Sequence, residues 1–171
     1  NKNTPDPIGG KIDKDQNGEP NGVLIDKASL LVESIIPKKS RTEEKQALKE
    51  GLIRTAQMGW TQLHDAGSPL SDYELLKEIK DEEGLPVRIQ FYVSDGDDAL
   101  KFIDNGPYFD EDHMLTARGV KLYADGAIGS RGAAFFKKYD DYETKGFLIF
   151  QKDKTMPKLI KALVNGIQVQ T

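Results

Sequence analysis

Apolar positions along the chain recur at helical spacing in four segments. The first two segments each open with a capping box, Ser40 to Glu43 and Ser71 to Glu74, in which side chains satisfy backbone groups at the start of a helix. Four helices are therefore expected, over residues 40–58, from residue 71 to about residue 84, over residues 97–104, and from just before Pro157 to about Asn165.

Short runs of β-branched and aromatic residues lie between these helices and predict strands. The strands are expected at residues 60–63, 87–93, 120–123, 147–150 and 167–170. Strands that alternate with helices are typical of βα units and a parallel sheet, so we expect an α/β fold. Ahead of the first helix, Asn17-Gly18 is a type I′ turn signal, which predicts a hairpin between residues 11–15 and 23–25.

Polar residues follow three of the predicted strands. His64 and Asp65 follow the first strand, Ser94 and Asp95 follow the second, and Asp125 comes shortly after the third. Because α/β folds place their chemistry at this end of the strands, we expect the site there. Successive strand residues point to opposite faces of a sheet, so only one of His64 and Asp65 should face the site.

The number of strands limits the architecture. About four βα strands are visible, whereas a complete eight-stranded β/α barrel takes about 250 residues. The 171 residues of this chain cannot close such a barrel. The chain is therefore either a small open-sheet protein or an internal piece of a larger one, and a predicted strand that runs into Thr171 favours the second alternative.

The composition is that of an ordinary globular domain, with 37% hydrophobic residues, 30% charged residues and a net charge of −4. Lysine and arginine are spread along the chain, which argues against a nucleic-acid partner. No run of residues is long and apolar enough to predict a membrane span. The absence of cysteine excludes disulfides and thiolate metal ligands. The compartment stays open, with a cytoplasmic location slightly favoured over a secreted or periplasmic one.

Lys121 lies in an apolar run, Val120 to Tyr123, and three roles are open for it. The side chain can point outward from a half-exposed strand, with its stem along apolar surface. It can instead face inward near the end of the strand, where an amine forms Schiff bases with carbonyl substrates. Once carboxylated by CO₂, it presents two oxygens, which suits a bridge between two divalent metal ions.

Residues 125–132, DGAIGSRG, form a glycine-rich connection after this strand. Glycines permit a close backbone approach or a positive φ. The spacing matches neither of two phosphate-binding motifs, GxxxxGK[ST] and GxGxxG. Arg131 is either an exposed loop residue or a clamp for a carboxylate or phosphate. His64 is likewise either a hydrogen-bonded structural histidine or a contact to metal or substrate.

Three stretches together carry a family resemblance. Residues 59–67, GWTQLHDAG, resemble the GvTsvhDaG segment of bacterial amidohydrolases of the third family type, whose members include N-substituted formamide deformylases. Residues 120–134, VKLYADGAIGSRGAA, resemble the vKlfaDGalgsrtAal stretch of the same family. Residues 6–24, from DPIGG to GVL, resemble its DPpGG to GvL segment. The three stretches occur in family order and span nearly the whole chain.

The resemblance implies a metal-dependent hydrolase built on a distorted TIM barrel. Residues 1–171 would then be one partial barrel domain that covers about strands two to five of the complete barrel. Residues 1–25 would form a loop and hairpin between strands one and two, and residues 26–171 would form the βα units. Lys121 would be the carboxylated bridging ligand for zinc or a similar divalent metal. The residues expected around it, in contact with substrate or ligands, are His64, Asp65, Asp125 and Arg131.

By the same resemblance, the other metal ligands of the family and its general-base aspartate lie outside residues 1–171. We therefore expect this chain alone to be catalytically inactive and to bind no metal stably. In the complete protein, metal-activated water would attack an amide-type or formamide-type, non-peptide C–N bond of a small molecule. Two alternatives stay open: a non-catalytic regulatory or binding protein that retains the fold, and a Schiff-base lysine enzyme. Exposed strand edges favour pairing with a second copy.

Overall fold

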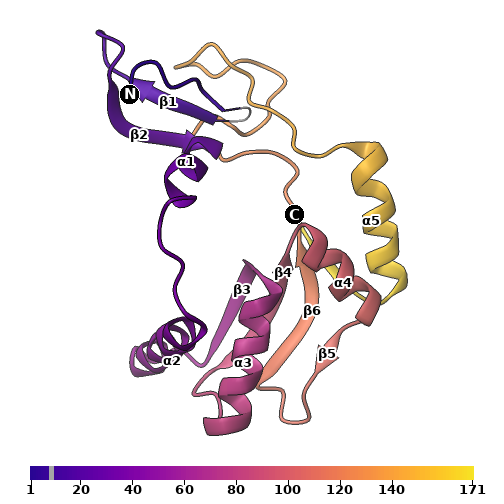
Figure 1. Ribbon diagram of the computed structural model, residues 1–171. Coiled ribbons are helices and arrows are strands. Elements are labelled where there is room, and N and C mark those ends of the chain that lie inside the picture. Colours follow the sequence, from indigo (N-terminus) through magenta and orange to yellow (C-terminus); the bar gives the residue numbers. More distant parts are fainter. Residues whose placement is uncertain (8–9) are drawn as a thin grey trace. The chain divides into compact units, whose positions relative to one another are not determined.

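The computed structural model describes residues 1–7 and 10–171, which form two compact units (Figure 1). The N-terminal unit comprises Asn1–Lys38 together with Ala127–Gly146. The sheet unit comprises Lys39–Gly126 together with Phe147–Thr171. Ile8 and Gly9, which belong to the first family-like stretch, lie outside the described residues. The predicted division of the chain at residue 25 stays a prediction.

The N-terminal unit contains a hairpin of β1 (Gly10–Lys14) and β2 (Pro20–Asp26), which confirms the predicted pairing. The predicted type I′ turn is wrong, because that turn needs a positive φ at both central residues and Asn17 has none. Instead, Gly18 has a φ of 79° and donates its N–H to the Asp15 carbonyl at 2.9 Å. A type I turn followed by a left-handed glycine is a common three-residue hairpin loop. The short η1 (Lys27–Ser29) and α1 (Leu30–Glu33) follow and were not predicted.

The sheet unit contains four parallel strands that neighbour one another in chain order, which confirms the predicted α/β class with a parallel sheet. These strands are β3 (Gln62–Ser68), β4 (Arg88–Ser94), β6 (Leu115–Lys121) and β7 (Gln168–Gln170). The two-residue β5 (Tyr108–Phe109) pairs antiparallel with β6. The helices of the unit are α2 (Arg41–Gln57), α3 (Leu70–Glu83), α4 (Asp97–Asn105) and α5 (Lys152–Val164). Within the described residues, no helix is long and apolar enough to cross a membrane.

The two predicted capping boxes have different outcomes. At α2 the Ser40 hydroxyl accepts the Glu43 N–H, and the Glu43 carboxylate accepts the Ser40 N–H at 2.8 Å. The second box is wrong, because α3 already begins at Leu70 and Ser71 therefore lies inside its first turn. The Ser71 hydroxyl donates to the Asp72 carboxylate instead.

Three predicted strands have different boundaries. β3 begins at Gln62, and Trp60 is 61% exposed, because the chain is still leaving α2 there and the Trp60 N–H donates to the Thr55 carbonyl. β6 begins at Leu115, five residues before the predicted start. Residues 147–150 form no strand, and only Leu148 makes an isolated bridge there.

The sheet has one apolar face and one polar face. β4 alternates between them, as a strand covered on one side should. Its odd-numbered residues from Ile89 to Val93 belong to the apolar core, and its even-numbered residues from Gln90 to Ser94 point to the polar face. Each helix contributes to the same core, and Figure 1 shows α3 and α4 against that face. Examples from the four helices are Leu52, Leu76, Phe102 and Ala162.

On the polar face, Gly119 of β6 provides the space for an aromatic ring of β4. A Cβ atom at this position would lie 2.2 Å from the Tyr92 ring, so no other residue type fits without moving that ring. The Tyr92 hydroxyl then reaches across β6 and donates to Gln168 Oε1 of β7 at 3.2 Å. The contact ties three neighbouring strands together just below their C-terminal ends.

Candidate functional site

Lys121 lies on the polar face, at the C-terminal end of β6. Its in-register neighbours are Ser94 of β4 and Gln170 of β7, so the ends of three strands place their side chains together. The lysine is half-buried, and its Nζ lies 5.1 Å from the centre of the Tyr123 ring. In-register neighbours of parallel strands point to the same face, so Lys121 points away from the apolar core.

The backbone of β3 approaches the stem of Lys121 closely at Gly67. A Cβ atom at Gly67 would lie 3.1 Å from Cβ and Cγ of Lys121 and 3.4 Å from Ser94 Oγ. The φ of Gly67 is 130°, a conformation that side chains rarely adopt. The glycine therefore sets the position of Lys121, a role that the sequence analysis did not assign, although residue 67 ends the GWTQLHDAG stretch.

Replacing Gly67 with alanine should destabilise the protein by about 1–3 kcal/mol, because φ is positive and the added methyl group presses on Lys121. The shift in the urea midpoint at constant slope measures this effect. Gly51→Ala is the matched control, since Gly51 lies inside α2 with open space around it. The control should stabilise the protein by about 0.5–1 kcal/mol. Equal effects of the two substitutions would contradict the proposed close approach.

His64 and Asp65 point to opposite faces of the sheet, as the alternation predicts. His64 pairs in register with Gln90 on the polar face, and its Nε2 lies 3.1 Å from the side-chain nitrogen of Gln62. Asp65 pairs with Phe91 on the helix side, where its carboxylate accepts the Ser68 hydroxyl at 2.8 Å. Of the two residues, only His64 therefore shares a face with Lys121.

The helix-side position of Asp65 affects the first turn of α3. Partial burial of the Asp72 carboxyl raises its pKa, and the negative charge of Asp65 raises this pKa further. Asp65 therefore lies on the side of the sheet that α3 covers, since its charge acts on Asp72 of that helix. The predicted substrate or ligand contact by Asp65 stays a prediction that this geometry does not favour.

Asp125 lies at the base of the glycine-rich connection that follows β6. It forms an isolated antiparallel bridge with Leu148, and the N–H groups of Ile149 and Phe150 both donate to the Ala124 carbonyl at 2.9 Å. These contacts close the connection into a loop with a fixed stem. The stem begins three residues after Lys121.

Arg131 lies in the N-terminal unit and holds a carboxylate of its own loop. Its Nη2 donates to Asp141 Oδ2 at 2.8 Å, its Nε donates to Oδ1 at 3.3 Å, and its guanidinium lies 5.1 Å from the Tyr142 ring centre. The hydrogen bonds from Arg131 lower the pKa of Asp141, and the same bonds raise the pKa of Arg131. Arg131 is therefore paired with a carboxylate of its own loop, and its predicted contact to a substrate group stays a prediction.

The acidic loop before β6 contains a buried carboxylate that sequence patterns did not reveal. Asp110 is only 6% exposed, although it lies in an acidic loop beside Glu111 and Asp112. Its Oδ2 accepts the Leu115 N–H at 2.7 Å and the Lys80 ammonium at 3.0 Å. The hydrogen bond that the Lys80 ammonium donates to Asp110 is the main cause of the raised pKa of Lys80. The residue fixes the start of β6, far along that strand from Lys121.

A divalent metal needs more ligands than the described residues bring together. In residues 1–7 and 10–171, no group of three or more His, Asp or Glu side chains is placed to hold a metal ion. Lys121 ends a strand on the polar face beside two further strand ends, and its predicted role as a metal ligand stays a prediction.

Similarity to a known protein family extends over nearly the whole chain. The sequence profile of the amidohydrolase family matches residues 1–169. The chain belongs to the amidohydrolase family. The family resemblance inferred from residues 59–67 and 120–134 is thereby confirmed, and Lys121 and His64 lie in the stretches that carried it.

Two proteins with sequence similarity to this amidohydrolase chain are much longer than it is. The chain is 34% identical over 183 residues to "Putative amidohydrolase YtcJ" of Bacillus subtilis, across 98% of this chain and 32% of the relative. It is 27% identical over 180 residues to "Protein LONG AFTER FAR-RED 3" of Arabidopsis thaliana, across 97% of this chain and 30% of the relative. The chain thus spans about a third of the length of these relatives.

Two solved structures share the fold of this amidohydrolase chain. Both are crystal structures of uncharacterized metal-dependent hydrolases, from Pyrococcus horikoshii and Pyrococcus furiosus. The TM-scores are 0.66 and 0.65, each at 20% sequence identity and across 93% of this chain. The matches cover 33% and 34% of the respective structures. At this identity, the likeness establishes the fold.

Proposed function

We propose that the protein that contains this chain is a metal-dependent hydrolase of amide-type, non-peptide C–N bonds in small molecules. The observation that carries the proposal is the position of Lys121. It ends a parallel strand on the polar face, half-buried, with Gly67 of β3 and Gln170 of the neighbouring strand β7 beside it. Family membership and the metal-dependent neighbours in fold support the same reaction class.

We also propose that the sheet unit is part of a β/α barrel. Its four parallel strands neighbour one another in chain order, and helices alternate with them along the chain. In such a barrel the apolar face of the sheet packs against the helices and the other face points inward, with the chemistry at the C-terminal ends of the strands. The polar face that carries His64, Tyr92 and Lys121 would then be the inner one.

In this proposal, Lys121 holds the metal through a carboxylated ε-amine. A divalent ion such as zinc, when bound, polarises the substrate carbonyl and lowers the pKa of a water molecule. Gly67 leaves room for the lysine stem, because a side chain at this position would press on Cβ and Cγ of Lys121. His64 lies on the same face and is available for polar contacts to substrate.

The reaction class can be tested with the protein expressed from its complete coding sequence. Hydrolysis of N-benzylformamide, followed by release of benzylamine, should disappear after dialysis against a chelator and return when zinc is added. The bound metal should be measured by mass spectrometry in parallel. Activity that persists in chelator-treated, metal-free protein would contradict the proposal.

A Schiff-base mechanism at Lys121 is distinguished by trapping. Borohydride reduction in the presence of a carbonyl substrate leaves a stable adduct on a Schiff-base lysine. We expect no adduct at Lys121, because a carboxylated amine is not available to attack a carbonyl. A covalent adduct on the peptide that contains residue 121 would favour the aldolase-type alternative over the hydrolase.

A further inference from the structure

The loop of residues 127–146 holds its own shape through internal contacts. In addition to the Arg131–Asp141 clamp, the Tyr139 hydroxyl donates to the Ala133 carbonyl at 2.9 Å. The Phe135 N–H donates to the Lys145 carbonyl at 2.8 Å. Contacts of this kind fix both the backbone and one aromatic side chain, so the loop can present a preformed surface although it contains no helix or strand.

The end of this loop packs too tightly for any residue but glycine. A Cβ atom at Gly146 would lie 1.9 Å from the Ala133 carbonyl oxygen, and the φ of Gly146 is 72°. The backbone of Gly146 therefore packs directly against that of Ala133. The segment between these two residues, which includes Phe135, Phe136 and Tyr139, is held on a closed base.

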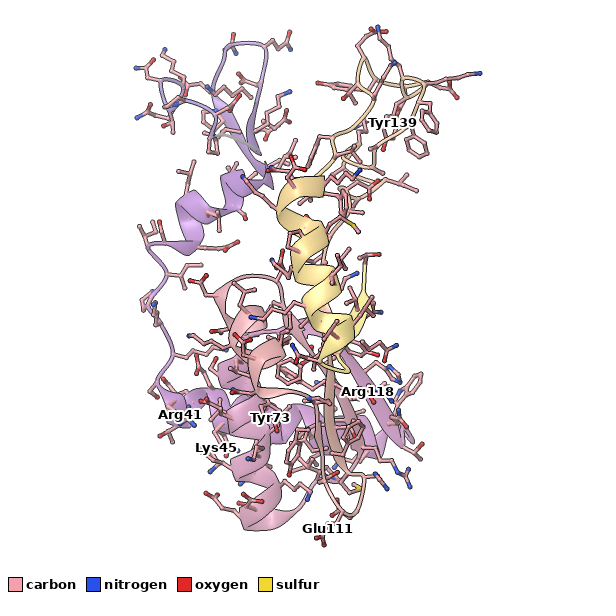
Figure 2. The ribbon with its side chains drawn as sticks, turned by 90° about the vertical axis from the view of Figure 1, so that its right-hand side faces the viewer. Arg41, Lys45, Tyr73, Glu111, Arg118 and Tyr139 are labelled. Carbon is pink, nitrogen blue, oxygen red and sulfur yellow. The ribbon has the colours of Figure 1, made fainter. Side chains whose placement is uncertain are left out.

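An open apolar cavity of about 530 Å³ lies in this loop. Its main side chains are those of Ile128, Phe135, Phe136 and Tyr139, and Figure 2 shows Tyr139 in the loop. The rings of Phe135 and Tyr139 meet edge to face, with centres 5.2 Å apart. Phe136 is fully exposed at 101% and Ile128 is 67% exposed, so the cavity presents apolar surface to water.

The size and lining of the cavity suit a small organic molecule. Ligand sites usually have volumes of about 300–1,000 Å³ and combine apolar and aromatic walls with a few polar groups. Here the charged side chains of Lys137 and Asp140 complete the wall. Edge-to-face aromatic pairs also leave ring faces available for stacking with a further ring. An aromatic group therefore matches the walls better than a polar ligand does.

The place of the loop in the chain also favours a binding role. The loop is the connection that follows β6, and its stem closes a few residues after the strand ends. Connections at the C-terminal ends of parallel strands carry the binding residues in β/α folds. Phe136 is grouped with Ile128, Phe135 and Tyr139 in this loop, so the loop presents a cluster of apolar side chains and not a single exposed ring.

We propose that this cavity binds the apolar, aromatic part of a small organic molecule. The ring of the ligand packs against Phe136 and Ile128, and the Phe135–Tyr139 pair forms the rigid wall. Because this binding needs no metal and no hydrolysis, its test is independent of the test of the proposed function.

Titration of the full-length protein with para-fluorobenzyl alcohol, followed by fluorine NMR, tests the proposal. This probe carries one ring and no bond that an amidohydrolase cleaves. We expect saturable binding that persists after metal removal, and a Kd at least about tenfold higher in Phe136→Ser. Val164→Ser is the matched control, because Val164 is an apolar residue of α5 that is 80% exposed and lies outside the cavity. Its Kd should equal that of the wild type.

Two outcomes would overturn the proposal. One is the absence of saturable binding to the wild type, which includes the case in which another part of the protein fills the cavity. The other is an unchanged Kd in Phe136→Ser. The urea midpoint of this variant should match that of the wild type, since the ring is fully exposed. If Phe136→Ser does not fold, Ile128→Ser replaces it, with the same expected loss of binding.

Discussion

In the full-length protein, Lys121→Ala is expected to lower kcat for amide hydrolysis by about a thousandfold or more. Under the proposed function, the side chain is a bridging metal ligand, and its loss would remove several kcal/mol of stabilisation of the charge that develops in the transition state. The variant should fold normally, because Lys121 lies on the polar face and takes no part in the apolar core.

Metal content and a second lysine make this prediction specific. Lys121→Ala should also contain less bound metal than the wild type, as measured by mass spectrometry. Lys121→Arg keeps a positive charge but cannot be carboxylated, so it should be equally inactive. Lys101→Ala, at an exposed lysine of α4 whose ion pair is to Asp98 of the same helix, should keep wild-type activity. Full activity and full metal content in Lys121→Ala would refute the ligand role.

Phe91→Ala should lower the free energy of unfolding by about 3–5 kcal/mol. Phe91 is 0% exposed, lies in the central strand β4 and packs against the Tyr73 ring of α3 with centres 5.7 Å apart. Truncation removes the buried ring and leaves a cavity between sheet and helix, which the surrounding strands cannot fill by collapse. The urea midpoint, converted through the unfolding slope, measures the loss.

The matched control is a Phe→Ala substitution at a position where the side chain is fully exposed to solvent. Phe136→Ala removes an identical ring that is 101% exposed, so its effect on unfolding should stay within about 0.5 kcal/mol. A similar loss in both variants would mean that Phe136 is buried in the folded protein. That result would contradict the exposed cavity as well as the stability argument.

Several elements of the fold could be predicted from local pattern. The capping box at Ser40 and the glycine at residue 59 bracket α2, because caps and left-handed glycines act within one turn of the helix. The strand of residues 88–94 was predicted almost to its ends, since β-branched and aromatic residues fill it. Local patterns succeeded where the deciding interactions lie within a few residues of one another.

Other elements were missed because distant residues decide them. The first part of β6 contains Ala117, Arg118 and Gly119, a run with little strand propensity, and pairing with β4 makes it a strand. Trp60 was expected inside a strand, yet it remains exposed because the end of α2 directs its backbone. No local pattern marks Asp110 as buried, because one partner of its carboxylate, Lys80, lies 30 residues away along the chain in α3.

The features of the candidate site also divide into those that the local sequence predicts and those that distant residues decide. The sequence by itself identified Lys121 through its place in an apolar run and a family stretch, and alternation correctly separated the faces of His64 and Asp65. These inferences need only the covalent order of residues and the two-residue period of a strand. The apolar helix-covered face and the class of fold follow from the same information.

Only the tertiary structure decided what surrounds Lys121. Parallel pairing brings Gly67, Ser94 and Gln170 beside it from positions up to 54 residues away along the chain (121 − 67 = 54). No local pattern encodes that register, because it depends on how sheet and helices pack together. The same holds for the aromatic cavity, whose walls meet only once the Arg131–Asp141 clamp and the Gly146 contact close their loop.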